Sequence, residues 1–276
     1  MFCHIKDGLV LQSDSEGIIL CHDTNISKLE IEKVQEALLN SKEKEKKRNN
    51  KFSMIKRSEF GGFFLSEFKI KKHEINITEN YNDELVELNP HILEFLNSKD
   101  NNGIILFHGL PGGGKTSYIR SLISTSSSRF IYVPNNLFCH ISDPEFIDCI
   151  STYPNSVVIL EDCEELLKPR EHNQTGTGIS NLLNLGDGLL GDALKLKIIC
   201  TFNSDLNKID EALLRKGRLI YRYEFGPLEV AKANKLLEKL QVSERVTTPT
   251  TLAEVYNLEH NNYGVVSKVN QIGFSS

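Results

Sequence analysis

Residues 109–116 read Gly-Leu-Pro-Gly-Gly-Gly-Lys-Thr and carry the clearest chemical pattern in the chain. They fit Gly-x-x-x-x-Gly-Lys-Ser/Thr and lie between an apolar segment, Ile104–His108, and a helix predicted from Lys115 to about Ser124. Glycine lets backbone N–H groups converge on phosphate oxygens, and the start of a helix adds positive potential. The segment therefore predicts an ATP site in which Lys115 contacts the β- and γ-phosphates and the Thr116 hydroxyl holds Mg²⁺. The residues expected to bind the nucleotide are Gly109, Pro111, Gly112, Gly113, Gly114, Lys115, Thr116 and Ser117.

A second chemical pattern is the pair Glu161-Asp162, which directly follows the apolar segment Val157–Leu160. A strand that delivers carboxylates at its end is the expected partner of a phosphate loop: one carboxylate holds Mg²⁺, and the next polarises the attacking water. Here the usual order, Asp then Glu, is reversed. We expect Glu161 to act with Thr116 at the metal and the shorter Asp162 to lie closer to the nucleophile, or to act through a second water. The alternative is an acidic helix start without a catalytic role.

Both patterns require strands and helices that alternate along the chain. Short apolar segments separated by helical patterns predict a parallel α/β sheet that is covered on both faces. The five predicted strands are Ile104–His108, Phe130–Val133, Val157–Leu160, Lys197–Thr201 and Leu219–Phe225. A helix is predicted before the first strand, at Pro90–Asn97. The helices predicted between strands include one that begins after Asp143 and Asp210–Arg215. Leu228–Leu240 and a capping box that begins at Thr251 then predict a small helical lid.

The first eighty residues predict a separate α+β region. Gly8–Gln12 and Gly17–His22 are apolar segments separated by a turn, and Ser27–Asn40 has helical spacing of its apolar residues. Phe52–Ile77 predicts two more strands around a Gly-Gly pair. We therefore expect three parts: an N-terminal region that recruits a substrate or partner (1–80), an ATP-binding core (81–226) and the helical lid (227–276).

The residues from 81 onward resemble the AAA ATPase family. Ser156–Leu166 is similar to the family's second nucleotide motif, and Ile198–Arg218 to its second region of homology. The Glu-Asp order also resembles the AAA translocase that moves the folded Rieske protein in mitochondria. The resemblance implies an AAA core with ATP and Mg²⁺ as cofactors.

The same resemblance implies roles for three further residues. Asn203 falls at the polar sensor that contacts the attacking water or the γ-phosphate. Arg215 and Arg218 fall where the family places arginine fingers, which reach the γ-phosphate of a neighbouring subunit. Fingers that act in trans require a ring or a helical assembly, most simply a hexamer. The alternative for the arginines is that they cap a helix C-terminus.

The chain also departs from the family pattern. Gly113 replaces a threonine, which predicts a more flexible loop, and Lys216 replaces a proline. No arginine stands beside Gly264, so an arginine sensor on the lid is not expected. Near Asn135–Phe138, where the pore loop should lie, there is no aromatic-glycine pair, and core packing is the expected role of Leu137 and Phe138.

Three functions are compatible with these patterns. The leading one is an ATP hydrolase that remodels proteins. The second is a DNA-associated loader or helicase-like ATPase, which would contact the DNA backbone through the basic run Lys42–Lys51. The third is a nucleotide-gated scaffold with low turnover. The net charge of −5 disfavours the DNA function, because nucleic-acid binders are typically basic.

Composition excludes several other classes. Hydrophobic residues make up 39% and charged residues 25%, which is typical of a globular protein. No apolar stretch approaches the roughly 18 residues that suggest a membrane span, and the first residues lack the apolar core of a secretory signal. Six cysteines without a Cys-x-x-Cys pair suggest reduced thiols, so a cytoplasmic location is expected.

Overall fold

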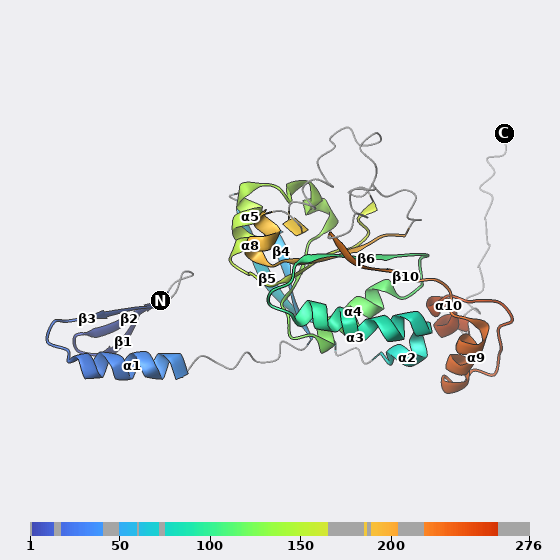
Figure 1. Cartoon of the computed structure of the whole chain (residues 1–276), viewed down its shortest axis with the longest axis horizontal. Coiled ribbons are helices and arrows are strands. Elements are labelled where there is room, and N and C mark those ends of the chain that lie inside the picture. Colours follow the sequence, from blue (N-terminus) through green and yellow to red (C-terminus); the bar gives the residue numbers. More distant parts are fainter. Residues whose placement is uncertain are drawn as a thin grey trace, which may run out of the picture. The chain divides into compact units, whose positions relative to one another are not determined.

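The structure is a computed structural model that describes residues 2–13, 18–40, 50–59, 61–71, 75–164, 185–186, 189–203 and 218–258. It divides into two compact units, Met1–Lys47 and Arg48–Ser276 (Figure 1). The division therefore lies well before residue 80, where the sequence patterns placed it.

The first unit is an antiparallel sheet with one helix. Strands β1 (Phe2–Lys6), β2 (Leu9–Ser13) and β3 (Ile18–His22) pair in that order, and α1 (Lys28–Asn40) follows. β2, β3 and α1 were predicted; β1 was not.

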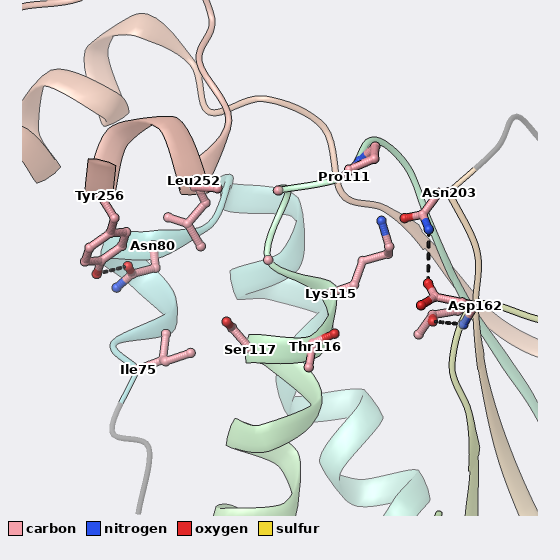
Figure 2. A pocket seen from close by; sticks show the side chains of 14 residues that line it. Ile75, Asn80, Pro111, Lys115, Thr116, Ser117, Asp162, Asn203, Leu252 and Tyr256 are labelled. Atoms are coloured by element: carbon pink, nitrogen blue, oxygen red, sulfur yellow. Dashed lines mark hydrogen bonds between the residues drawn. The ribbon is translucent and has the colours of Figure 1, made fainter. Parts of the chain in front are cut away.

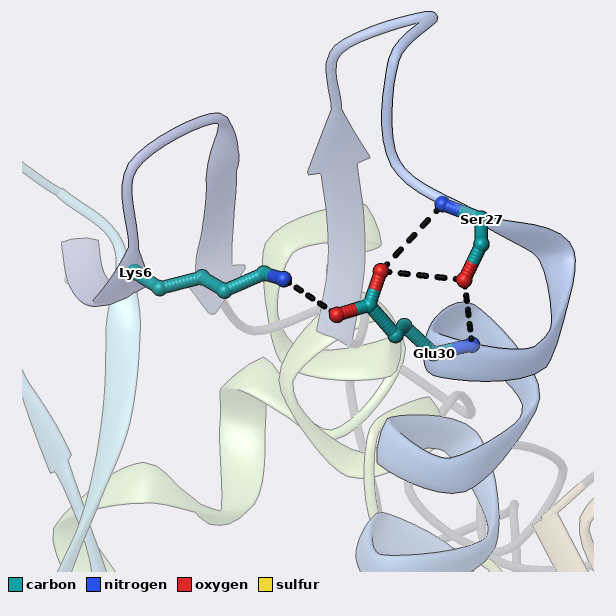
Figure 3. Close-up of polar contacts among 3 residues, drawn as sticks. All are labelled: Lys6, Ser27 and Glu30. Atoms are coloured by element: carbon teal, nitrogen blue, oxygen red, sulfur yellow. Dashed lines mark hydrogen bonds and ion pairs between the residues drawn. The ribbon is translucent and has the colours of Figure 1, made fainter.

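The start of α1 is fixed by polar contacts around Glu30 (Figure 3). The Ser27 hydroxyl accepts from the Glu30 N–H at 3.4 Å, and the Glu30 carboxylate accepts from the Ser27 N–H at 3.3 Å, which forms a capping box. Lys6 on β1 pairs with the same carboxylate at 2.5 Å and, with Ser27, lowers its pKa. The helix is thus linked to the sheet of its own unit.

The second unit is built on a seven-stranded sheet in the order β10-β6-β9-β8-β7-β4-β5. Neighbouring strands from β10 to β4 are parallel, and β5 is antiparallel to β4. In this order the strands are Leu219–Glu224, Gly103–His108, Lys197–Thr201, Val157–Leu160, Phe130–Tyr132, Lys51–Arg57 and Phe63–Lys69. The five predicted strands are all present and parallel.

Strands β4 and β5 correct the predicted strand count and the predicted extent of the N-terminal region. Ser53 and Met54 of β4 pair with Ile131 and Tyr132 of β7, and Ile55 is fully buried in the core. These two strands therefore extend the sheet, β4 as a parallel strand and β5 as an antiparallel strand at its edge. Backbone pairing across 78 residues leaves no mark on the local pattern of either strand, which is why the sequence did not reveal it.

Helices cover both faces of this sheet (Figure 1). Alternate residues of β6 face two apolar clusters, with Ile104 and Leu106 on one side and Ile105 and Phe107 on the other. The first cluster includes residues of α5 (Pro144–Ser151) and α8 (Leu189–Leu194), and the second includes α3 (Asp83–Asn97), α4 (Lys115–Thr125), α9 (Val230–Lys239) and α10 (Leu252–Asn257). Because both faces are covered, every residue of β6 is buried.

Several predicted details can be located in this unit. Thr251 and Glu254 form the predicted capping box at the start of α10. Leu137 and Phe138 lie in the 3₁₀ helix Asn135–His140 and are buried in the first cluster, as expected for core residues. The predicted helix Asp210–Arg215 lies outside the described residues. Among the described helices, none is long and apolar enough to cross a membrane.

Lys197 is a fully buried lysine in the interior strand β9. Its ammonium has no hydrogen-bond partner among the described residues, and burial lowers its pKa to about 8, an effect that the charge of Asp100 opposes. The ordinary pKa is 10.5, so the unfolded chain holds this proton to higher pH than the folded chain. The stability of the fold should therefore rise with pH between about 8 and 10.5.

Replacing Lys197 with methionine is expected to raise the free energy of unfolding at pH 7 by about 1–3 kcal/mol, because a similar volume is filled without a buried charge. The gain should shrink at pH 10, where the lysine is already neutral in the folded chain. Urea unfolding of both proteins at the two pH values measures the difference. A variant that is less stable than the parent at pH 7 would show that the ammonium is stabilised.

Candidate nucleotide site

The loop between β6 and α4 forms the predicted phosphate cradle. β6 ends at His108, and α4 begins at Lys115 with Gly114 as its N-cap at φ +97°. L-residues with a side chain rarely adopt this left-handed conformation, so glycine is needed there. The loop thus directs the start of α4 and its backbone N–H groups toward one end of the sheet.

Gly113 is required by close packing. A Cβ on Gly113 would lie 2.4 Å from the carbonyl oxygen of Phe225, a backbone atom that follows β10. A threonine at position 113 would force these two backbone segments apart. Glycine at position 113 therefore permits the close approach of the Phe225 backbone. The sequence alone did not provide this reason for the third glycine.

Neighbouring elements hold the loop on two further sides. The Tyr81 hydroxyl donates to the carbonyl of Gly114 at 3.0 Å, and the Ala253 N–H donates to the carbonyl of Gly112 at 3.0 Å. Tyr81 is 2% exposed and packs edge-on against the ring of Phe225. The cradle is therefore supported by the chain before α3 and by the start of α10.

Lys115 is folded back over the loop. Its ammonium donates to the carbonyls of Gly109 at 2.8 Å and Leu110 at 3.1 Å, and the residue is 7% exposed. Burial lowers the pKa of the ammonium, and the charges of Asp162 and Glu164 oppose that shift. This lysine is therefore a cation held in the cradle beside two carboxylates.

The carboxylates after β8 lie against the start of α4. The Thr116 hydroxyl donates to Oε1 of Glu161 at 2.7 Å, so the two predicted metal ligands are in direct contact. The nearby charges of Glu161 and Asp162 add to burial in raising the pKa of Tyr132. A hydroxyl and a carboxylate side by side form a hard oxygen donor set, which suits Mg²⁺.

Asp162 and Asn203 are also brought together, as Figure 2 shows. The Asn203 amide donates to Oδ1 of Asp162 at 3.0 Å, and the Asp162 N–H donates to the Thr201 hydroxyl at 3.0 Å. The two residues follow β8 and β9, which are neighbours in the sheet. A carboxylate and an amide at this place can orient a water molecule near the cradle.

A cavity of about 580 Å³ joins these groups to a second, less polar end (Figure 2). That end is formed by Ile75, Asn80, Leu252 and Tyr256, and the Tyr256 hydroxyl donates to Oδ1 of Asn80 at 2.5 Å. A cavity of this size is large enough for a nucleotide. No sequence motif marks these four residues, so they were not among the predicted site residues. The full lining is Ile75, Asn80, Pro111, Gly112, Gly114, Lys115, Thr116, Ser117, Asp162, Thr201, Asn203, Leu252, Ala253 and Tyr256.

Arg218 lies away from this cavity. Its carbonyl accepts from the N–H of Ile104 at the start of β6, whereas the phosphate loop follows the end of that strand. Six strand residues span roughly 20 Å. The structure therefore does not bring Arg218 to the cradle of its own chain, and Arg215 lies outside the described residues.

A parallel sheet with a glycine-rich loop after β6 and carboxylates after β8 defines a phosphate-loop nucleotide-binding protein. More narrowly, residues 105–227 match the family described as ATPase family associated with various cellular activities (AAA). This part of the chain is therefore similar to AAA ATPase domains, a class of ATP-hydrolysing domains.

Several curated proteins are similar to the chain. ATPase family gene 2 protein of Schizosaccharomyces pombe is 29% identical over 157 residues, which cover 52% of this chain and 19% of that protein. The 26S proteasome regulatory subunit 4 homolog of Encephalitozoon cuniculi is 25% identical over 189 residues, covering 64% of this chain and 42% of that protein. Protein CdcH of Halobacterium salinarum is 28% identical over 165 residues, covering 54% of this chain and 22% of that protein. The chain thus spans less than half the length of each of these relatives.

Proposed function

We propose that this chain is an ATP hydrolase whose turnover drives the remodelling of a protein client. The observation that carries the proposal is the convergence of Lys115, Thr116, Asp162 and Asn203 on one cavity, with Glu161 in contact with the Thr116 hydroxyl. The match of residues 105–227 and the similarity to proteasome regulatory subunits support the same class of activity.

Each group in the cavity has a distinct task in this proposal. Backbone N–H groups of the loop and the Lys115 ammonium bind the phosphates. Thr116 and Glu161 would hold Mg²⁺, which neutralises charge on the β- and γ-phosphates when it is bound. Asp162 accepts a hydrogen bond from the attacking water, and the Asn203 amide keeps the carboxylate in place.

The proposed assembly is a homo-oligomer, most simply a hexameric ring, with nucleotide sites at its subunit interfaces. Arg218 supports this, because it lies at the opposite end of β10 from its own cradle. We further propose that Met1–Lys47 recruits the client and that the protein acts in the cytoplasm. The Glu161-Asp162 order, which resembles the Rieske translocase, keeps translocation of a folded protein within this proposal.

No described observation favours the DNA function. The basic run Lys42–Lys51 lies mostly outside the described residues. Its last member, Lys51, pairs at 2.6 Å with Glu67 on the neighbouring strand.

The test of hydrolysis is the Asp162→Asn variant. It is expected to bind ATP with the affinity of the parent and to lose at least about 100-fold in kcat, because the amide cannot take up a proton from water. Phosphate release and equilibrium ATP binding, both with Mg²⁺, are the two measurements. Parent chains that bind ATP without turnover would support the gated scaffold instead. Normal hydrolysis by Asp162→Asn, with Glu161→Gln inactive but still able to bind Mg²⁺, would show that the two roles are inverted.

A further inference from the structure

The segment that follows β8 is tied to the segment that follows β9 by a set of short hydrogen bonds. The N–H groups of Asp162 and Cys163 donate to Thr201, one to its hydroxyl at 3.0 Å and one to its carbonyl at 2.9 Å. In return, the Asn203 N–H donates to the Glu164 carboxylate at 2.6 Å, and its side-chain amide donates to Asp162 at 3.0 Å. Thr201 and Glu164 thus each hold one member of the Asp162–Asn203 pair.

The Thr201 hydroxyl accepts a hydrogen bond from Asp162, a residue with an unusual backbone conformation. Asp162 has φ +52°, in the left-handed region, which costs a residue with a side chain about 1 kcal/mol or more. The Asp162 N–H would lose its hydrogen-bond acceptor if the Thr201 hydroxyl were removed. Thr201 itself is 2% exposed and is fixed by pairing with Phe107 in the sheet. A rigid, buried hydroxyl therefore fixes the backbone that carries the Asp162 carboxylate.

Glu164 holds the backbone of Asn203. Its carboxylate accepts from the Asn203 N–H, and its charge acts on the Lys115 ammonium together with that of Asp162. Glu164 does not line the cavity. The carboxylate therefore acts on the site through Asn203 and through its charge.

We propose that Thr201 and Glu164 are positioning residues for hydrolysis, with Thr201 holding Asp162 and Glu164 holding Asn203. This inference rests on the proposed ATPase function. It adds Thr201, which lines the cavity and holds the Asp162 backbone, and Glu164, which acts through Asn203. It also accounts for the Glu-Asp order. Asp is several-fold enriched at positive φ, whereas Glu is not, so a backbone of this shape favours the shorter carboxylate at position 162.

The first test removes one hydroxyl. Thr201→Val keeps the branched shape and is expected to lower kcat about 10- to 100-fold, as misplaced catalytic groups do, with ATP affinity within twofold of the parent. Thr201→Ser restores the hydroxyl and is expected to recover most of kcat. Thr125→Val is the matched control, because the Thr125 hydroxyl donates to the carbonyl of Ser121 on α4 and Thr125 does not line the cavity.

The second test uses Glu164 and does not depend on the stability of the Thr201 variant. Glu164→Ala removes the acceptor and is expected to lower kcat about 10-fold at unchanged ATP affinity. Glu164→Gln keeps an acceptor oxygen without the charge and should retain most of kcat, because the hydrogen bond to Asn203 is preserved.

The outcomes separate this inference from the proposed function. A parent that neither binds nor hydrolyses ATP defeats both. A parent that hydrolyses ATP, together with normal kcat in folded Thr201→Val and Glu164→Ala, overturns the positioning roles alone. The positioning roles also fail when Thr201→Ser is as slow as Thr201→Val, or when the variants lose ATP affinity while kcat is unchanged.

Discussion

Lys115→Ala is expected to weaken ATP binding about 10- to 100-fold or more. The lysine supplies the side-chain cation of the phosphate loop, and a hydrogen bond to a charged group contributes about 1.5–3 kcal/mol. In the structure its ammonium already lies over the loop, 2.8 Å from the Gly109 carbonyl, so little rearrangement is needed to meet a phosphate oxygen. Loss of the amine leaves backbone N–H groups and Thr116 to hold a highly charged ligand.

Calorimetric titration with ATP and Mg²⁺ measures this loss. The control is Lys99→Ala, which removes an exposed lysine from the turn between α3 and β6. It should bind ATP as the parent does, and both variants should unfold with the parent's cooperativity. An affinity for Lys115→Ala within twofold of the parent would show that the loop does not bind the phosphates.

Local patterns in the sequence predicted the parts of the site that depend on spacing along the chain. The loop Gly109–Thr116, the carboxylates after β8 and the amide Asn203 each follow a strand directly. Since parallel strands end at one edge of a sheet, naming the strands was enough to expect these groups close together, and the structure has them in contact. The direct hydrogen bond from Thr116 to Glu161 is a consequence of that arrangement.

The features that sequence reasoning missed depend on contacts between distant segments. β4 joins the sheet through pairing of Ser53 with Ile131, and Gly113 is small because of Phe225, more than a hundred residues away. The left-handed backbone of Asp162 is hydrogen-bonded to the hydroxyl of Thr201, 39 residues further along the chain. In each case the residue type alone fits several local structures, and a partner remote in sequence selects one of them.

The arginines lead to the second large effect, which concerns assembly. An Arg215→Ala/Arg218→Ala chain is expected to be inactive, because arginine fingers contribute roughly 10³-fold or more in rate. A Lys115→Ala chain is expected to be inactive because it binds ATP weakly. Arg218 directly precedes β10, at the end of the strands opposite the loop that follows β6. To reach its own nucleotide, the guanidinium would have to cross roughly 20 Å along the sheet. Side-by-side packing of two subunits can place it at the neighbour's cradle instead.

Mixing the two inactive chains should therefore restore hydrolysis. The intact loop of the arginine-deficient chain meets the intact finger of the other, and in a random equal mixture about one interface in four is competent. Turnover per subunit of the parent should also rise with protein concentration. The control replaces the Lys115→Ala chain by one that also carries Arg215→Ala and Arg218→Ala, which supplies neither group and should restore nothing. If native mass measurement shows mixed assemblies and hydrolysis still stays at the level of this control, the fingers do not act between subunits, and the arginines are left with the alternative role of capping the helix predicted over Asp210–Arg215.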